Sequence, residues 1–248
     1  IPTLERIFAE VPLLIATHCE DTPLINKNLA AFRQRYGEAI PPEAHPLIRS
    51  REACFKSSSL AATLARKYKS RLHILHLSTA EETKLPDSGI RTQKQITGEV
   101  CVHHLWFNDQ AYTSKGNLVK WNPAIKTEQD RLSLLKAVKE GRIDIIATDH
   151  APHLLSEKNG PYTQAASGGP MIQHSLTVML ELMEKGYFSL AEIVDRMCHA
   201  PADLFHISQR GYLRKGYKAD ICIFKKSPWT VTKDNLLYRC GWSPLENT

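Results

Sequence analysis

Short apolar runs alternate with longer amphipathic segments along this chain of 248 residues. Four of the short runs have the length and composition of buried strands, and they lie at 12–17, 72–77, 99–103 and 143–148. Between these runs, residues 50–69 carry apolar side chains near helical spacing, and capping-box sequences that begin at Thr79, Thr127 and Ser189 each predict the start of a helix. Strands that alternate with helices predict a parallel sheet covered by helices.

The pattern changes after about residue 208. Glycines at 211 and 216 indicate turns, residues 219–224 have the apolar character of a strand, and no long helical pattern follows. We therefore divide the chain into a barrel-like part, 1–208, and part of a small β domain, 209–248. The least patterned stretch, 154–170, directly follows the fourth predicted strand, and we expect it to be a mobile loop beside an active site.

Composition narrows the class of protein. Hydrophobic residues make up 42% and charged residues 23%, as in an ordinary globular protein, and no apolar run is long enough for a membrane span. The net charge of +6 is spread along the chain, which disfavours nucleic-acid binding and suits a small anionic substrate. The six cysteines form no CxxC pair, which argues against disulfides or a zinc ribbon and fits a reducing cytoplasm. We expect Cys19 and Cys101 to be small buried side chains.

Ionisable side chains follow the fourth apolar run. Asp149, His150 and His153 come directly after 143–147. A buried charge costs several kcal/mol unless it is paired or bound to a metal, so we expect Asp149 to have such a partner. We expect His150 to have a structural role, donating a hydrogen bond to a neighbouring carbonyl.

Two other predicted strands end in the same way. His18 ends the first, and His76 lies near the end of the second. His73 has the opposite parity to His76, so strand alternation predicts that it points toward the helices or the solvent. In α/β barrels the carboxyl ends of the strands form the active site, and imidazole and carboxylate are ligands of zinc. The pattern therefore predicts a hydrolytic metal site that includes His18, His76 and Asp149.

The segments LIATHCED, LHILHLST, VHHLWF, NPAIK and ATDHAPH occur in this order along the chain. Together they resemble the cyclic-amidohydrolase branch of the amidohydrolase superfamily, most closely the class I dihydroorotases. The resemblance implies a TIM-like (β/α)8 metal-dependent hydrolase barrel, of which this chain holds roughly strands five to eight and part of the small β domain. It also implies reversible hydrolysis of dihydroorotate to N-carbamoyl-L-aspartate in pyrimidine synthesis.

The resemblance assigns roles residue by residue. His18 and His76 match ligands of the more exposed of two zinc ions, and Asp149 matches a ligand of the more buried ion that also carries the proton. Three positions match residues of the substrate pocket: Asn122, His153 and His104. Because His103 is adjacent to His104 on a predicted strand, we expect it to face away from the site.

The chain also departs from the family pattern. The first-strand HxH pair and the bridging lysine of the family have no counterpart in this sequence. We therefore expect the chain to be a C-terminal portion whose partner is the N-terminal half of the same protein, in a homo-oligomer, namely a dimer. Two alternatives remain open: a hydantoinase- or allantoinase-type cyclic amidase, and a non-catalytic homologue that acts through interactions.

Overall fold

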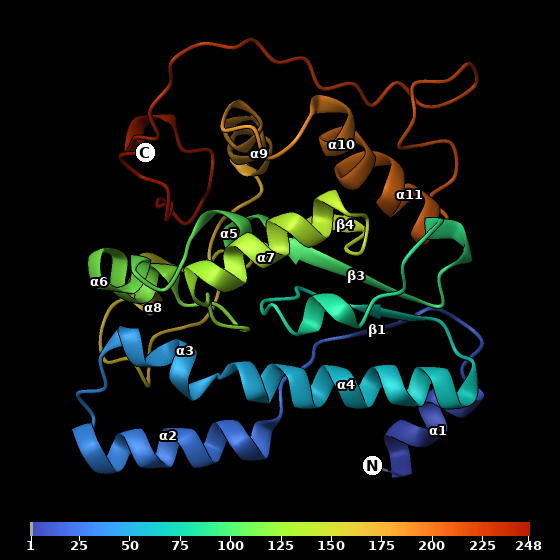
Figure 1. Cartoon of the computed structure of the whole chain (residues 1–248). Coiled ribbons are helices and arrows are strands. Elements are labelled where there is room, and N and C mark those ends of the chain that lie inside the picture. Colours follow the sequence, from blue (N-terminus) through green and yellow to red (C-terminus); the bar gives the residue numbers. More distant parts are fainter. Residues whose placement is uncertain (1) are drawn as a thin grey trace.

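A computed structural model describes residues 2–248, and it contains one four-stranded parallel sheet (Figure 1). The strands are β1 (Ile15–Thr17), β2 (Leu72–Ile74), β3 (Ile96–Cys101) and β4 (Ile145–Ala147), and they lie side by side in chain order. Each strand pairs in parallel with the next, with Thr17 opposite Ile74 between β1 and β2. The predicted alternation of strands and helices is confirmed, although three of the four strands are shorter than predicted.

Helices connect and cover the strands. Their bounds are α1 (Pro2–Glu10), α2 (Thr22–Tyr36), α3 (His45–Ile48), α4 (Arg51–Tyr68), α5 (Val102–Trp106), α6 (Ala111–Lys115), α7 (Glu128–Lys139), α8 (Leu155–Lys158), α9 (Ser175–Glu184), α10 (Leu190–Val194) and α11 (Ala200–Leu204). A π-helical turn, Asp195–His199, joins α10 to α11. No helix within residues 2–248 is long and apolar enough to cross a membrane.

Two of the three predicted capping boxes start helices. The Thr127 side chain accepts a hydrogen bond from the Asp130 amide at the start of α7, and Ser189 does the same for Glu192 at the start of α10. The third prediction, at Thr79, is wrong as a helix, because only a 3₁₀ turn at Glu82–Lys84 forms there. Thr79 and Glu82 still exchange the hydrogen bonds of a helix cap. The buried Glu82 carboxylate, however, also accepts a hydrogen bond from the Ser78 amide, 3.2 Å away, and this contact keeps Glu82 at the turn.

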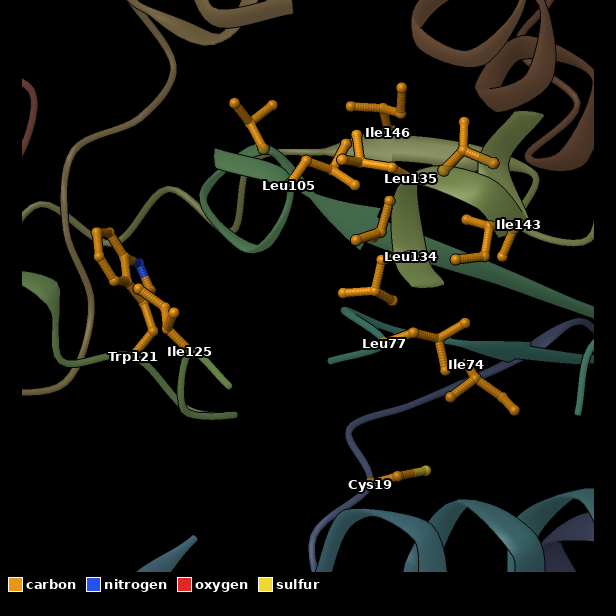
Figure 2. Close-up of a cluster of buried hydrophobic side chains, with 14 of the residues drawn as sticks. Cys19, Ile74, Leu77, Leu105, Trp121, Ile125, Leu134, Leu135, Ile143 and Ile146 are labelled. Atoms are coloured by element: carbon orange, nitrogen blue, oxygen red, sulfur yellow. The ribbon is translucent and has the colours of Figure 1, made fainter. Parts of the chain in front are cut away.

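The main hydrophobic cluster lies on one face of the sheet. Even-numbered strand residues such as Leu72 and Ile74 pack there with α4 and α7. Figure 2 shows part of this cluster, with Leu134 and Leu135 of α7 gathered near Ile146. Burying these side chains stabilises the sheet against its covering helices. The opposite face carries polar residues such as His73 and, at β4, a smaller apolar cluster of Ile145 with Ala200 and Leu204 of α11.

The predicted strand at 219–224 is wrong. This part of the chain, coloured orange-red in Figure 1, runs past α10 and α9 as an extended segment without helix or strand, and Ile223 is 91% exposed. A strand forms only when another strand accepts and donates its backbone hydrogen bonds, and no strand within residues 2–248 lies beside this segment. The proposed division of the chain after residue 208 stays a prediction.

Candidate functional site

The two histidines predicted as metal ligands lie next to each other. His18 directly follows β1, and His76 follows β2 by two residues, so the parallel pairing of the strands brings both to the same edge of the sheet. His18 Nδ1 lies 3.0 Å from His76 Nε2, and the two rings meet edge to face with centroids 4.8 Å apart. Two imidazole nitrogens at this separation can converge on one ion.

A buried carboxylate orients His18. The Glu20 side chain is 2% exposed, and its Oε2 lies 3.0 Å from His18 Nε2 and also pairs with Arg49. Burial raises the pKa of the Glu20 carboxyl, but the His18 hydrogen bond and the charges of Arg49 and Lys126 outweigh it and lower that pKa. When Nε2 of His18 donates to Glu20 from a neutral ring, Nδ1 carries the lone pair that faces His76.

Sequence reasoning missed the Glu20–Arg49 pair. Arg49 lies just before α4, and its guanidinium pairs with the Glu20 carboxylate. The partners are 29 positions apart, so no local spacing signals the contact. Only packing of the α4 start against the β1 end brings them together.

The prediction for His73 is wrong. His73 is fully buried on the face of the sheet opposite the main hydrophobic cluster. There its Nδ1 lies 2.9 Å from Thr97 Oγ1, and its Nε2 lies 3.2 Å from Glu99 Oε2. The alternation argument fails because β2 ends at Ile74 and His76 has a φ of +36°. The parity of a strand does not extend through a residue in the left-handed region.

Asp149 lies at the end of β4 in a half-buried position. Burial and the nearby Glu99 carboxylate raise its pKa, whereas the charge of His18 opposes that rise. Asp149 also has a φ of +43°, so it shares with His76 a backbone region that is uncommon for residues other than glycine and is concentrated at functional sites. Asp149 is therefore within electrostatic range of His18.

Within residues 2–248, one group of three donors has all its ligand atoms within 4.8 Å of one another, and it is Cys101, His103 and His104. The predicted set of His18, His76 and Asp149 is not as compact, so the chain contributes an adjacent pair and a more distant carboxylate. The burial expected for Cys101 is confirmed, since its side chain is 0% exposed.

The expected separation of His103 from His104 does not occur. The strand β3 ends at Cys101, so both histidines lie in α5, and their ring centroids are 4.3 Å apart. His103 stacks on Trp121 at 4.3 Å between centroids, and His104 Nε2 lies 3.1 Å from the Pro123 carbonyl oxygen. Burial lowers the pKa of His104 to about 3, so the ring is neutral and donates from Nε2.

Asn122 and His153 lie on either side of two glycines. Asn122 follows Trp121, and its Oδ1 is buried without a hydrogen-bond partner among the described residues. A Cβ at Gly169 would stand 2.6 Å from Trp121 Cζ2, and one at Gly168 would stand 3.2 Å from His153 Cδ2. The absence of side chains here therefore allows His153 and the Asn122 segment to approach each other.

His153 and His150 both hold backbone groups. His153 Nε2 lies 3.0 Å from the Ser167 carbonyl oxygen. His150 has the structural role that was expected, but it accepts rather than donates, because its Nδ1 lies 3.1 Å from the Met171 amide nitrogen. Both contacts attach the end of β4 to the segment that follows.

The segment 154–170 is tied down by two buried lysines. It contains α8, and Lys158 Nζ donates to the carbonyls of Lys120, Ala166 and Gly168 at 3.2, 2.8 and 2.7 Å. Lys120 Nζ in turn donates to the Tyr162 carbonyl at 2.8 Å. Burial lowers the pKa of Lys158 to about 7 and that of Lys120 to about 8. These contacts anchor a segment that was expected to be a mobile loop. The residue pattern alone does not indicate them.

Comparison with known proteins places this site in a family. Residues 6–239 match the Amidohydrolase family. The chain is 31% identical over 243 residues to a dihydroorotase from Anaplasma phagocytophilum, covering 96% of this chain and 52% of that protein. It is 33% identical over 235 residues to a dihydroorotase from Pyrococcus furiosus, covering 94% and 50%. The chain thus spans about half the length of these curated relatives.

Solved structures agree on the fold. An L-hydantoinase (dihydropyrimidinase) from Arthrobacter aurescens superposes with a TM-score of 0.85 at 23% identity, covering 99% of this chain and 56% of that one. A dihydroorotase from Saccharomyces cerevisiae, solved with 5-fluoroorotic acid, gives 0.58 at 14% identity, covering 63% and 44%. The predicted fold class is confirmed: the four strands and their helices are part of a TIM-type barrel. Members of the matched family are generally metal-dependent, and by this match the chain belongs to the amidohydrolase family.

Proposed function

We propose that this chain supplies half of the catalytic barrel of a dihydroorotase. The enzyme would hydrolyse the ring amide of dihydroorotate reversibly to N-carbamoyl-L-aspartate. The observation that carries the proposal is the pair of adjacent imidazoles at two strand ends, His18 Nδ1 and His76 Nε2, 3.0 Å apart and backed by Glu20. The names of curated relatives at 31% and 33% identity support dihydroorotate as the substrate.

The donor set fits a metal site. Burial and the His18 charge lower the pKa of His76 to about 4, so His76 is neutral at pH 7, the form that binds metals. His18, His76 and Asp149 would hold zinc, two ions per active site, with further ligands from the N-terminal half of the protein. When bound, zinc polarises the ring carbonyl and acidifies the attacking water.

Asp149 carries the proton in this proposal. In hydrolysis its carboxylate accepts a proton from the attacking water and delivers it to the leaving ring nitrogen. In the biosynthetic direction it takes the proton from the attacking carbamoyl nitrogen. In the metal-free chain, burial and Glu99 raise the pKa of Asp149. A bound zinc ion would lower that pKa, so the carboxylate would be charged when it accepts the proton.

In this proposal the residues around α5 and Asn122 position the substrate. The unpartnered Asn122 Oδ1 can accept a hydrogen bond from the ring N–H, and His104 supports this region by donating to the Pro123 carbonyl oxygen. His153 approaches from the other side of Gly168. The six free cysteines support a reducing cytoplasm as the location, and we propose a homodimer as the assembly.

A steady-state comparison on the full-length protein tests the proposal. Dihydroorotate should be turned over with a higher kcat/KM than hydantoin or allantoin. A higher value for hydantoin or allantoin would assign the protein to that type of cyclic amidase instead. Elemental analysis separates the non-catalytic alternative: purified protein with its N-terminal half intact but without bound zinc and without turnover would contradict the enzymatic proposal.

A further inference from the structure

Three buried donor groups gather at the junction of β3 and α5. Cys101 is the last residue of the strand, and His103 and His104 lie in the helix that follows it. One ligand atom from each lies within 4.8 Å of the others, and the three residues are 0, 0 and 2% exposed. None of the three is among the ligands proposed for the catalytic metals.

Three of the four histidine nitrogens in this cluster have no hydrogen-bond partner among the described residues. Both ring nitrogens of His103 and Nδ1 of His104 are buried and have no hydrogen-bond partner within residues 2–248. Such buried groups are rare in folded proteins, and each costs about 1–3 kcal/mol. Stacking on Trp121 holds the His103 ring in place but satisfies neither nitrogen. Because His104 donates from Nε2 to Pro123, its Nδ1 has a free lone pair.

We infer that Cys101, His103 and His104 form a binding site for a thiophilic divalent cation, of which Zn²⁺ is the representative. One thiolate and two imidazoles are a ligand set that zinc accepts, with an open fourth position. Bond lengths of about 2.0–2.3 Å place tetrahedral ligand atoms about 3.4–3.6 Å apart, so the donors must approach by about 1 Å. Binding would therefore require small rotations of the Cys101 and imidazole side chains.

The charge balance also favours a divalent cation. Cys101 loses its thiol proton to solvent on binding, so zinc with one thiolate and two neutral imidazoles retains one positive charge. Burial, together with the carboxylates of Glu99 and Asp149, holds the pKa of the Cys101 thiol well above its usual range in the metal-free chain, and the same carboxylates would offset the positive charge of a bound ion. The ion would tie the end of β3 to α5 through His103, whose ring stacks on Trp121, the residue before Asn122.

Cobalt spectroscopy on the metal-free, full-length protein tests the site. Bound Co²⁺ should give a thiolate-to-metal charge-transfer band, and the proposed catalytic ligands include no cysteine that could produce one. Cys101→Ser should abolish the band. The matched control is Cys54→Ser, because Cys54 is equally buried, at 0% exposure, but belongs to α4 and not to this cluster. The control variant should retain the band.

Loss of one imidazole should weaken the site. His103→Asn should reduce the cobalt affinity, measured from the intensity of the band. The reduction should exceed the roughly 10- to 100-fold loss that removal of an outer-shell partner causes. Wild-type protein that binds cobalt without a thiolate band would overturn the inference, whether or not the variants fold. A band that survives Cys101→Ser would also overturn it. Turnover of dihydroorotate is measured separately, so failure of the proposed function and failure of this site are distinguishable.

Discussion

Acidification should destabilise this protein through its buried neutral histidines. Burial lowers the pKa of His76 to about 4 and that of His104 to about 3 in the folded chain. In the unfolded chain both return to about 6.5. Between the two values the unfolded state binds more protons, so the stability that each neutral ring contributes is complete above pH 6.5 and is lost as the pH falls. The window runs from 6.5 to about 4 for His76 and to about 3 for His104.

The size of the effect follows from the width of that window. One pKa unit corresponds to about 1.4 kcal/mol, so the 1.5 units between pH 6.5 and pH 5 cost about 2 kcal/mol for each histidine and about 4 kcal/mol for both. That is a large share of the 5–15 kcal/mol that stabilises an ordinary domain. Asp149 acts in the opposite direction, because its raised pKa favours proton uptake by the folded state.

Urea denaturation followed by tryptophan fluorescence measures the loss. Metal-free wild-type protein should lose several kcal/mol of unfolding free energy between pH 7 and pH 5. His104→Gln cannot take up the proton, so its loss over the same interval should be smaller by about 2 kcal/mol. Comparing the two proteins removes the shared contribution of Asp149 and the other carboxyls. An equal loss in wild type and variant would refute the claim that His104 is held neutral by burial.

Three further substitutions test the catalytic assignment and the packing beneath it. Asp149→Asn should lower kcat on dihydroorotate at least about 100-fold while leaving the circular dichroism spectrum unchanged, and near-normal turnover would exclude Asp149 as the proton carrier. Gly169→Ala places a Cβ 2.6 Å from Trp121 Cζ2, so thermal denaturation should reveal a cost of about 1–3 kcal/mol, and an unchanged Tm would contradict the tight approach. Lys158→Met leaves the carbonyls of Ala166 and Gly168 without their lysine donor, whereas the Lys120 carbonyl keeps the Gly168 amide. The variant should cost about 1–3 kcal/mol, against less than about 0.5 kcal/mol for the exposed Lys136→Met, and equal values in urea denaturation would argue against the lysine anchor.

Local hydrogen bonds explain why parts of the fold were predictable. The capping boxes at Thr127 and Ser189 join residues three positions apart, so their signal is contained in the sequence. The segment at 219–224 shows the limit, because its apolar residues have the pattern of a strand but no strand lies beside it within residues 2–248. An apolar pattern indicates that a segment can form a strand, and hydrogen bonding to a neighbouring strand decides whether it does.

Strand ends explain why part of the site was predictable. Parallel strands place their carboxyl ends at one edge, so His18 and His76 could be expected together before any contact was known, and they lie 3.0 Å apart. The same reasoning failed for His73 and His103. It assumed that strand alternation continues to the polar residues, whereas β2 ends at Ile74 and β3 ends at Cys101.

By itself the sequence determined the alternation of strands and helices, two helix starts, and the histidines and aspartate at the strand ends, because these depend on neighbours within a few residues. Tertiary structure alone decided that Arg49 holds Glu20 behind His18 and that Lys158 anchors the segment after β4. These partners are separated by many positions, and only the packing of one element against another brings their buried charges and carbonyls within hydrogen-bond distance.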